Sequence, residues 1–185
     1  MKQWSLRELI FFALCCDLGL FSKKLIGPAA NLLTDALHIP GGIGTGFSLM
    51  FLVIAAAVCP RPGCGLVMGA VQSVLALSFG MVGSMGALSP AGYVVPGIVI
   101  DLVLDLTRKS GLSLAERTAL SNALASAAAA LTANWIVFRL WGPPLWLYLA
   151  VALTAGALYG MLGGAAAKRL IPILGKAPVG EGEVV

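Results

Sequence analysis

The chain has 185 residues, of which 59% are hydrophobic and 11% charged, and its net charge is +4. Soluble domains carry about 25% charged residues, so this composition excludes an ordinary globular fold and indicates a membrane protein. The basic residues lie singly or in pairs at the ends of apolar stretches, which is typical of topology signals and forms no basic face for nucleic acid.

Six apolar stretches, each long enough or nearly long enough to cross a bilayer, follow one another along the chain. In hydrocarbon the backbone must satisfy its own hydrogen bonds, so we expect all six to be helices. The predicted spans are residues 6–21, 43–59, 63–82, 91–106, 114–140 and 145–171. The sequence therefore predicts an all-α membrane domain of six transmembrane helices over residues 1–174, followed by a disordered cytoplasmic tail over residues 175–185.

Lys and Arg are divided unequally between the two alternate sets of connections. Nine lie at the N-terminus, in the connections after spans 2 and 4, and at the C-terminus, whereas the other set holds only Lys23, Lys24 and Arg139. By the positive-inside rule, this places both termini in the cytoplasm.

The two longer outer connections, residues 22–42 and 83–90, contain Gly and Pro and are predicted to hold movable segments. Within the first, Asn31, Asp35 and His38 recur at helical spacing. We interpret them as a short amphipathic segment that lies over the bundle and gates it; ordinary loop polarity is the alternative.

Small residues recur every fourth position in two spans and predict close helix packing. The sixth span carries Ala152, Gly156, Gly160 and Gly164, and the third carries Gly65, Gly69 and Ser73. Such stripes join helices within a bundle or dock a partner subunit, and the intramolecular use is favoured here.

The fourth span carries an acidic stripe. Tyr93, Gly97, Asp101 and Asp105 share one helix face. A carboxylate exposed to lipid costs on the order of 2.5–3.5 kcal/mol, so Asp101 is predicted to face the interior or a wet cavity. Its partner would be a polar group across the bundle, a proton or a ligand. Asp105 lies near the cytoplasmic end, where Arg108 or Lys109 can pair with it.

Polar residues also follow one face of the fifth span. Asn122, Ser126, Ala130 and Asn134 lie at steps of four, and Trp141 follows. Asn134 and Trp141 could hydrogen-bond and stack on a planar ring, although Trp141 also fits an interfacial aromatic belt. Gln72, at depth in the third span, predicts an interhelical hydrogen bond.

Catalytic and metal-binding patterns are missing from the sequence. The glycine-rich stretch 41–46 is followed by Phe47, not by the Lys and Ser or Thr of a phosphate-binding loop. The four cysteines and the single histidine, His38, do not have the spacing of a metal site. We therefore expect no enzyme activity in this chain, no cofactor and no metal.

Three segments carry a resemblance to a known family. They are Lys2–Ile10, which leads into a first helix with the small residues Ala13, Cys16 and Gly19; Arg61-Pro62-Gly63, which opens the third helix; and Pro96-Gly97, followed by Asp101. Over residues 2–172 the chain resembles the substrate-binding S components of energy-coupling factor (ECF) transporters. It looks most like the YkoE-type group linked to thiamine or its hydroxymethylpyrimidine precursor.

The resemblance implies a multi-pass prokaryotic cell-membrane protein with partners. A transmembrane T component would dock on the first helix at Ala13, Cys16 and Asp17, and two cytoplasmic ATPase subunits would supply energy. Asp17 departs from the alanine often found in the family, which leaves open whether it faces the partner or the interior.

The ligand implied by the resemblance is a small heteroaromatic vitamin or precursor, bound in the outer half of the bundle beneath the first outer connection. The predicted binding residues are Asp101, Tyr93, Gly97, Gln72, Asn134 and Trp141. Two other functions remain open: a self-sufficient carrier in which Asp101 relays protons, and a non-transporting assembly subunit that uses the Gly156–Gly164 stripe as its interface.

Overall fold

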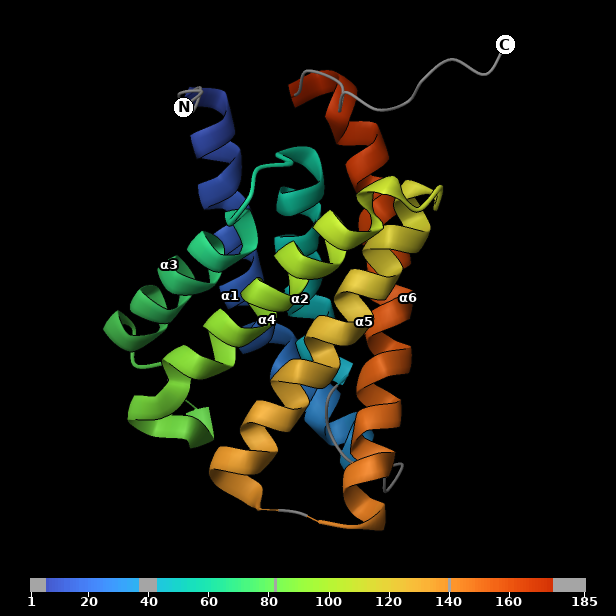
Figure 1. Ribbon diagram of the computed structural model, residues 1–185. Helices are drawn as coiled ribbons and strands as arrows, with labels where there is room; N and C mark the ends of the chain where they lie inside the picture. Colours follow the sequence, from blue (N-terminus) through green and yellow to red (C-terminus); the bar gives the residue numbers. More distant parts are fainter. Residues whose placement is uncertain (1–5, 37–42, 82, 140, 175–185) are drawn as a thin grey trace.

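The computed structural model describes residues 6–36, 43–81, 83–139 and 141–174, with the backbone alone at residues 30, 31, 33–35, 83, 84 and 138. Every regular element within these ranges is helical, which confirms the predicted all-α class. The elements are α1 (Leu6–Ala36), α2 (Ile43–Val58), α3 (Cys64–Ser78), η1 (Gly83–Leu88), α4 (Ser89–Leu106), η2 (Thr107–Lys109), α5 (Leu114–Ala133), η3 (Asn134–Phe138) and α6 (Pro143–Leu174) (Figure 1).

Three helical stretches are long and apolar enough to cross a membrane: Met85–Lys109, Leu114–Val137 and Pro143–Leu174. The apolar helices α2 and α3 have only 16 and 15 residues. The chain is therefore a helical, membrane-embedded protein, while six crossings and their direction remain predictions. The beginning of α1 and the end of α6 lie at the same end of the bundle (Figure 1), as an even number of crossings requires.

The described residues of the two predicted outer connections, 22–36 and 83–90, are helical, so the predicted end of the first helix at residue 21 is wrong. The helical spacing of Asn31 and Asp35 agrees with the structure, and the mobility of these segments stays a prediction. Helix α1 continues through Pro28 to Ala36, and the backbone of Asn31 and Asp35 belongs to it. The cause is the run of leucine, isoleucine and alanine on both sides of the proline, which favours helix. The side chains of Asn31 and Asp35, and all of His38, lie outside the described residues, as does the predicted tail. The second predicted loop, residues 83–90, forms η1 and the start of α4.

Helices α5 and α6 touch backbone to backbone along the small-residue stripe of α6. A Cβ atom added at Gly156 would lie 2.8 Å from the Ala123 Cα atom, and one at Gly160 would lie 2.5 Å from the Thr118 carbonyl oxygen. The stripe is therefore buried within the chain, and its intramolecular interpretation is confirmed.

A buried amide ties a third helix to this contact. The Asn122 Nδ2 group donates to the Gly46 carbonyl oxygen of α2 (3.0 Å) and to the Gly156 carbonyl oxygen of α6 (2.8 Å). Asn122 is fully buried, where a satisfied hydrogen bond is strong and an unsatisfied one is costly. Gly46 also lies against Gly156, so α2, α5 and α6 meet at one point.

A second backbone contact joins α3 to α4. A Cβ atom at Gly65 would lie 2.5 Å from the Gly97 carbonyl oxygen, and one at Gly69 would lie 2.6 Å from the Tyr93 carbonyl oxygen. The small residues of α3 are therefore also used for packing within the bundle. Their contact with α4 fixes the position of the Tyr93 backbone along α3.

Replacing Gly160 by alanine should destabilise the bundle. The new methyl group would meet the Thr118 carbonyl oxygen, and overpacking of this kind costs about 1–3 kcal/mol. The free energy of unfolding can be measured by titrating the purified chain with sodium dodecyl sulfate in mixed micelles. Gly27→Ala is the matched control, because no atom of another described segment lies within 4 Å of the position of its Cβ atom. Equal losses in the two variants would contradict a backbone contact at Gly160.

Candidate functional site

Asp101 is bound to the beginning of α3. Its Oδ1 atom accepts a hydrogen bond from the Gly65 backbone N–H (2.7 Å), and its Oδ2 atom accepts one from the Leu66 backbone N–H (2.8 Å). The first turn of a helix has N–H groups without intrahelical acceptors, and a carboxylate there also interacts favourably with the helix dipole. Asp101 is therefore a cap supplied to α3 by α4.

The local sequence explains why α3 needs this cap. Gly63, at the position before the helix, adopts a left-handed conformation (φ 81°) and has no side chain that could accept a hydrogen bond. The neighbouring amides are satisfied by backbone, because Cys64 N–H donates to the Arg61 carbonyl oxygen and Val67 N–H to that of Gly63. Each Asp101 oxygen thus accepts a hydrogen bond from α3, which is the polar partner across the bundle that the sequence analysis allowed for. That Asp101 also forms the floor of a ligand site stays a prediction.

Tyr93 also has a partner from within the chain. The Lys23 Nζ atom of α1 lies 4.6 Å from the centroid of the Tyr93 ring, within the range of a cation–π interaction. Since Tyr93 is only 9% exposed, little of its ring remains for another cation.

Gln72 and Gly97 serve packing. The Gln72 Nε2 group donates to the Cys16 carbonyl oxygen across α3 and α1 (3.0 Å), which confirms the predicted interhelical hydrogen bond and assigns this amide to the fold. Gly97 is buried against Gly65. Neither residue lines a described cavity.

Asn134 and Trp141 do not form the predicted pair. Asn134 is buried at the beginning of η3, a π-helical turn that ends at Arg139 in a left-handed conformation (φ 46°). Trp141 is 78% exposed in the connection to α6, and Trp135 is exposed as well. These exposures fit the aromatic-belt interpretation of Trp141, and they correct its placement in an inner site.

Asp105 and the predicted docking residues of α1 are placed as follows. Asp105 is exposed, and no ion pair of Asp105 occurs within the described ranges. Ala13 and Asp17 are exposed one turn apart, whereas Cys16, which lies beside them on the helix surface, is buried. Cys16 is therefore corrected to a core residue, and Asp17 points away from the interior. Its exposed neighbours on α1 are Leu9, Ile10, Leu14, Leu18 and Phe21.

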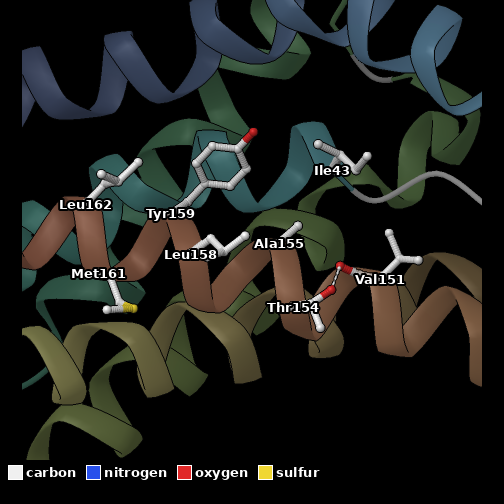
Figure 2. A pocket seen from close by; sticks show the side chains of 8 residues that line it. All are labelled: Ile43, Val151, Thr154, Ala155, Leu158, Tyr159, Met161 and Leu162. Atoms are coloured by element: carbon white, nitrogen blue, oxygen red, sulfur yellow. Dashed lines mark hydrogen bonds between the residues drawn. The ribbon is translucent and has the colours of Figure 1, made fainter.

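An open groove of about 720 Å³ lies along α6, at a place that the sequence analysis did not predict (Figure 2). It is lined by Ile43, Val151, Thr154, Ala155, Leu158, Tyr159, Met161 and Leu162. These residues of α6 follow helical spacing, but an apolar stripe facing a groove has the same pattern as one facing lipid. The sequence therefore contained no signal that distinguished them.

The groove offers apolar surface, one aromatic ring and little polarity. The Thr154 hydroxyl is used within its own helix, where it donates to the carbonyl oxygens of Ala150 (2.9 Å) and Val151 (3.1 Å). The Tyr159 ring is held edge-on by Phe47, with centroids 5.3 Å apart and planes at 82°. Because the described lining has no charged side chain, the groove suits an uncharged ligand with an apolar or aromatic body.

Comparisons with protein-family models, curated proteins and solved structures found no match to this chain.

Removing the Asp101 carboxylate should weaken the fold. Asp101→Ala leaves the Gly65 and Leu66 amides without their acceptors, so we expect a loss of about 1–3 kcal/mol in the free energy of unfolding. Backbone amide exchange should also accelerate at Gly65 and Leu66. Asp105→Ala is the matched control and should change stability by less than about 0.5 kcal/mol, because Asp105 is exposed. Unchanged exchange at both amides would contradict the capping role.

Proposed function

We propose that this chain is a membrane-embedded subunit that works only when a partner covers α1. The carboxylate of Asp17 is the observation that carries the proposal. It lies 11 residues after Leu6, about 17 Å along α1 and near mid-membrane if α1 begins at one surface. An exposed carboxylate at that depth is costly in lipid, and a partner that pairs with it removes the cost.

The specific function that we propose is substrate binding for an ATP-driven ECF-type importer. The chain would capture its ligand outside, dock through α1 on a T component, and release the ligand when two cytoplasmic ATPases hydrolyse ATP. The resemblance of residues 2–172 to S components supports this assignment, as does the exposure of Ala13 and Asp17 on the helix that docks in that family. Catalysis would reside in the partners and not in this chain.

The α6 groove is the ligand site that we propose in place of the Asp101 stripe. It begins two turns into α6 and includes Ile43 at the start of α2. With the predicted orientation, the beginning of α6 and the start of α2 belong to the outer half of the bundle. Since the lining is uncharged and Asp101 is engaged by α3, neutral hydroxymethylpyrimidine fits the site better than cationic thiamine.

Asp17→Leu tests the docking surface. If Asp17 faces a partner, the variant should fold at least as well as the original chain but lose at least ten-fold in recovery of the complex with co-expressed T component and ATPases. Asp105→Leu removes another exposed helical carboxylate and should leave recovery unchanged. Full recovery of the Asp17→Leu complex would remove the observation on which the proposal rests.

Ala155→Trp tests the groove. The indole should fill part of the 720 Å³ and weaken binding of labelled hydroxymethylpyrimidine by the purified chain at least ten-fold. Leu102→Trp places the same side chain on an exposed position of α4, outside the groove, and should not affect binding. If both variants bind normally, the ligand lies elsewhere; displacement of phospholipid instead of vitamin would identify the groove as a lipid site.

A proton-coupled carrier is the second candidate, and an assembly subunit without transport is the third. An assembly role would use α1, because α5 covers the Gly156–Gly164 stripe. Uptake of labelled ligand by cells that express the chain with and without T component and ATPases separates the three. The proposed function requires all the subunits, a carrier works alone and stops with an uncoupler, and an assembly subunit supports no uptake under either condition.

A further inference from the structure

We propose that Lys23, Tyr93 and Ser89 form a binding site for a phosphate-type oxyanion where α1 passes the beginning of α4. The inference does not depend on the proposed function. It rests on a cation held in place by an aromatic ring, on the lack of an internal counter-ion for that cation, and on a buried hydroxyl group one helical turn away.

The Lys23 ammonium group is positioned by its contact with the Tyr93 ring. Its Nζ atom lies 4.6 Å from the Tyr93 ring centroid, and Tyr93 is fixed by the contact of its carbonyl oxygen with Gly69 of α3. The Lys23 residue is nevertheless exposed, so an outside ligand can reach it. A ring face accepts only one side of an ammonium group, which leaves N–H donors free for an anion.

The described carboxylates are bound or placed elsewhere. Glu8 pairs with Arg61, Asp101 binds α3, and Glu116 binds Ser113 at the start of α5. Asp105 lies 12 residues beyond Tyr93 on α4, which corresponds to roughly 18 Å along the helix axis. Asp17 lies six residues before Lys23 on α1, a spacing that puts the two side chains on different faces. Across the described part of the chain, no ion pair neutralises Lys23.

The Asp35 side chain is not described, but its backbone lies 12 residues beyond Lys23 in the same helix. This separation corresponds to roughly 18 Å along the axis. Asp35 is therefore too far along α1 to serve as the counter-ion.

Ser89 supplies the second polar group. It is 2% exposed, and its Oγ atom has no hydrogen-bond partner in the described structure. Ser89 and Tyr93 are four residues apart on α4 and thus share one face, so the hydroxyl lies one turn from the ring that holds Lys23. The Ser126 Oγ atom also lacks a partner in the described structure, but it lies in the α5–α6 contact. Ser89 is the one of these two hydroxyls that lies near a cation, where it can bind a ligand or a water.

The chemistry of the ligand follows from these groups and from their place in the bilayer. An ammonium group and a hydroxyl donor together suit the oxygens of a phosphate. Lys23 lies 17 residues after the start of α1, about 25 Å along the helix. If the first helix crosses the bilayer as the sequence predicts, this is close to the membrane surface opposite the α1 N-terminus. The phosphate could thus belong to a lipid headgroup or to a free solute, and the two share this recognition.

Lysine NMR of the full-length chain tests the site. The chain is purified in uncharged maltoside micelles, and its lysines are ¹³C-dimethylated, which keeps their charge; Lys23→Arg and Lys24→Arg identify the two signals. Inorganic phosphate and dihexanoylphosphatidylglycerol are titrated separately. Lys24 is the internal control, because it is the adjacent lysine and is also exposed.

We expect the Lys23 signal to shift saturably with at least one probe, at a concentration at least five-fold lower than Lys24 requires. Ser89→Ala should raise the half-saturating concentration about five-fold, the effect of one lost hydrogen bond. Saturation by phosphate assigns a free solute, and saturation by the lipid alone assigns a headgroup. Lys23 and Lys24 responding alike, or Lys23 ignoring both probes, would overturn the site, and an unchanged Ser89→Ala titration would remove Ser89 from it. None of these outcomes bears on vitamin transport.

Discussion

Direct contact between helix backbones, at positions where glycine leaves room for it, is the constraint on which this structure depends. In lipid no hydrophobic force draws helices together, so the bundle relies on close van der Waals contact and on interhelical hydrogen bonds. Both occur at one point, where Gly156 touches Gly46 and α5, and the Asn122 amide bonds to the carbonyl oxygens of both glycines. Helices α2, α5 and α6 are thereby fixed relative to one another, and the α6 groove forms on the far side of this contact.

The same constraint determines what the polar side chains at depth can do. Where backbones approach closely, their amide and carbonyl groups become accessible to neighbouring helices, and three polar residues use them: Asp101 binds two amides of α3, while Gln72 and Asn122 bind carbonyl oxygens. Hydrogen bonds of this kind stabilise a fold, although the buried Asn122 Oδ1 atom has no partner in the described structure. Asp17 and Lys23 differ, because both are exposed and neither has a counter-ion in the described structure. The proposed docking surface therefore rests on Asp17, and the proposed oxyanion site rests on Lys23.

Much of the fold could be predicted from the sequence, because its signals are periodic. Glycine at every fourth position of α6 predicts close packing wherever the partner helix lies, and the apolar runs predict helices. The site was harder to predict for a physical reason. The groups that bind Asp101 are the backbone N–H groups of Gly65 and Leu66. Every residue type except proline has such a group, so the sequence does not show that Asp101 binds there. The groove residues are likewise apolar whether lipid or a ligand covers them, and Pro28 looks like a loop signal although α1 continues through it.

The cap that α4 supplies to α3 has a consequence for motion. The Asp101 carboxylate binds the first turn of α3, and the glycines of α3 contact the backbone of α4. Helices α3 and α4 are thus held together at more than one point along their length and cannot easily slide or rotate against each other. Helices α3 and α4 thus form one rigid unit within the bundle. Any rearrangement of the bundle is therefore expected to move α3 and α4 together, with the contact between them preserved.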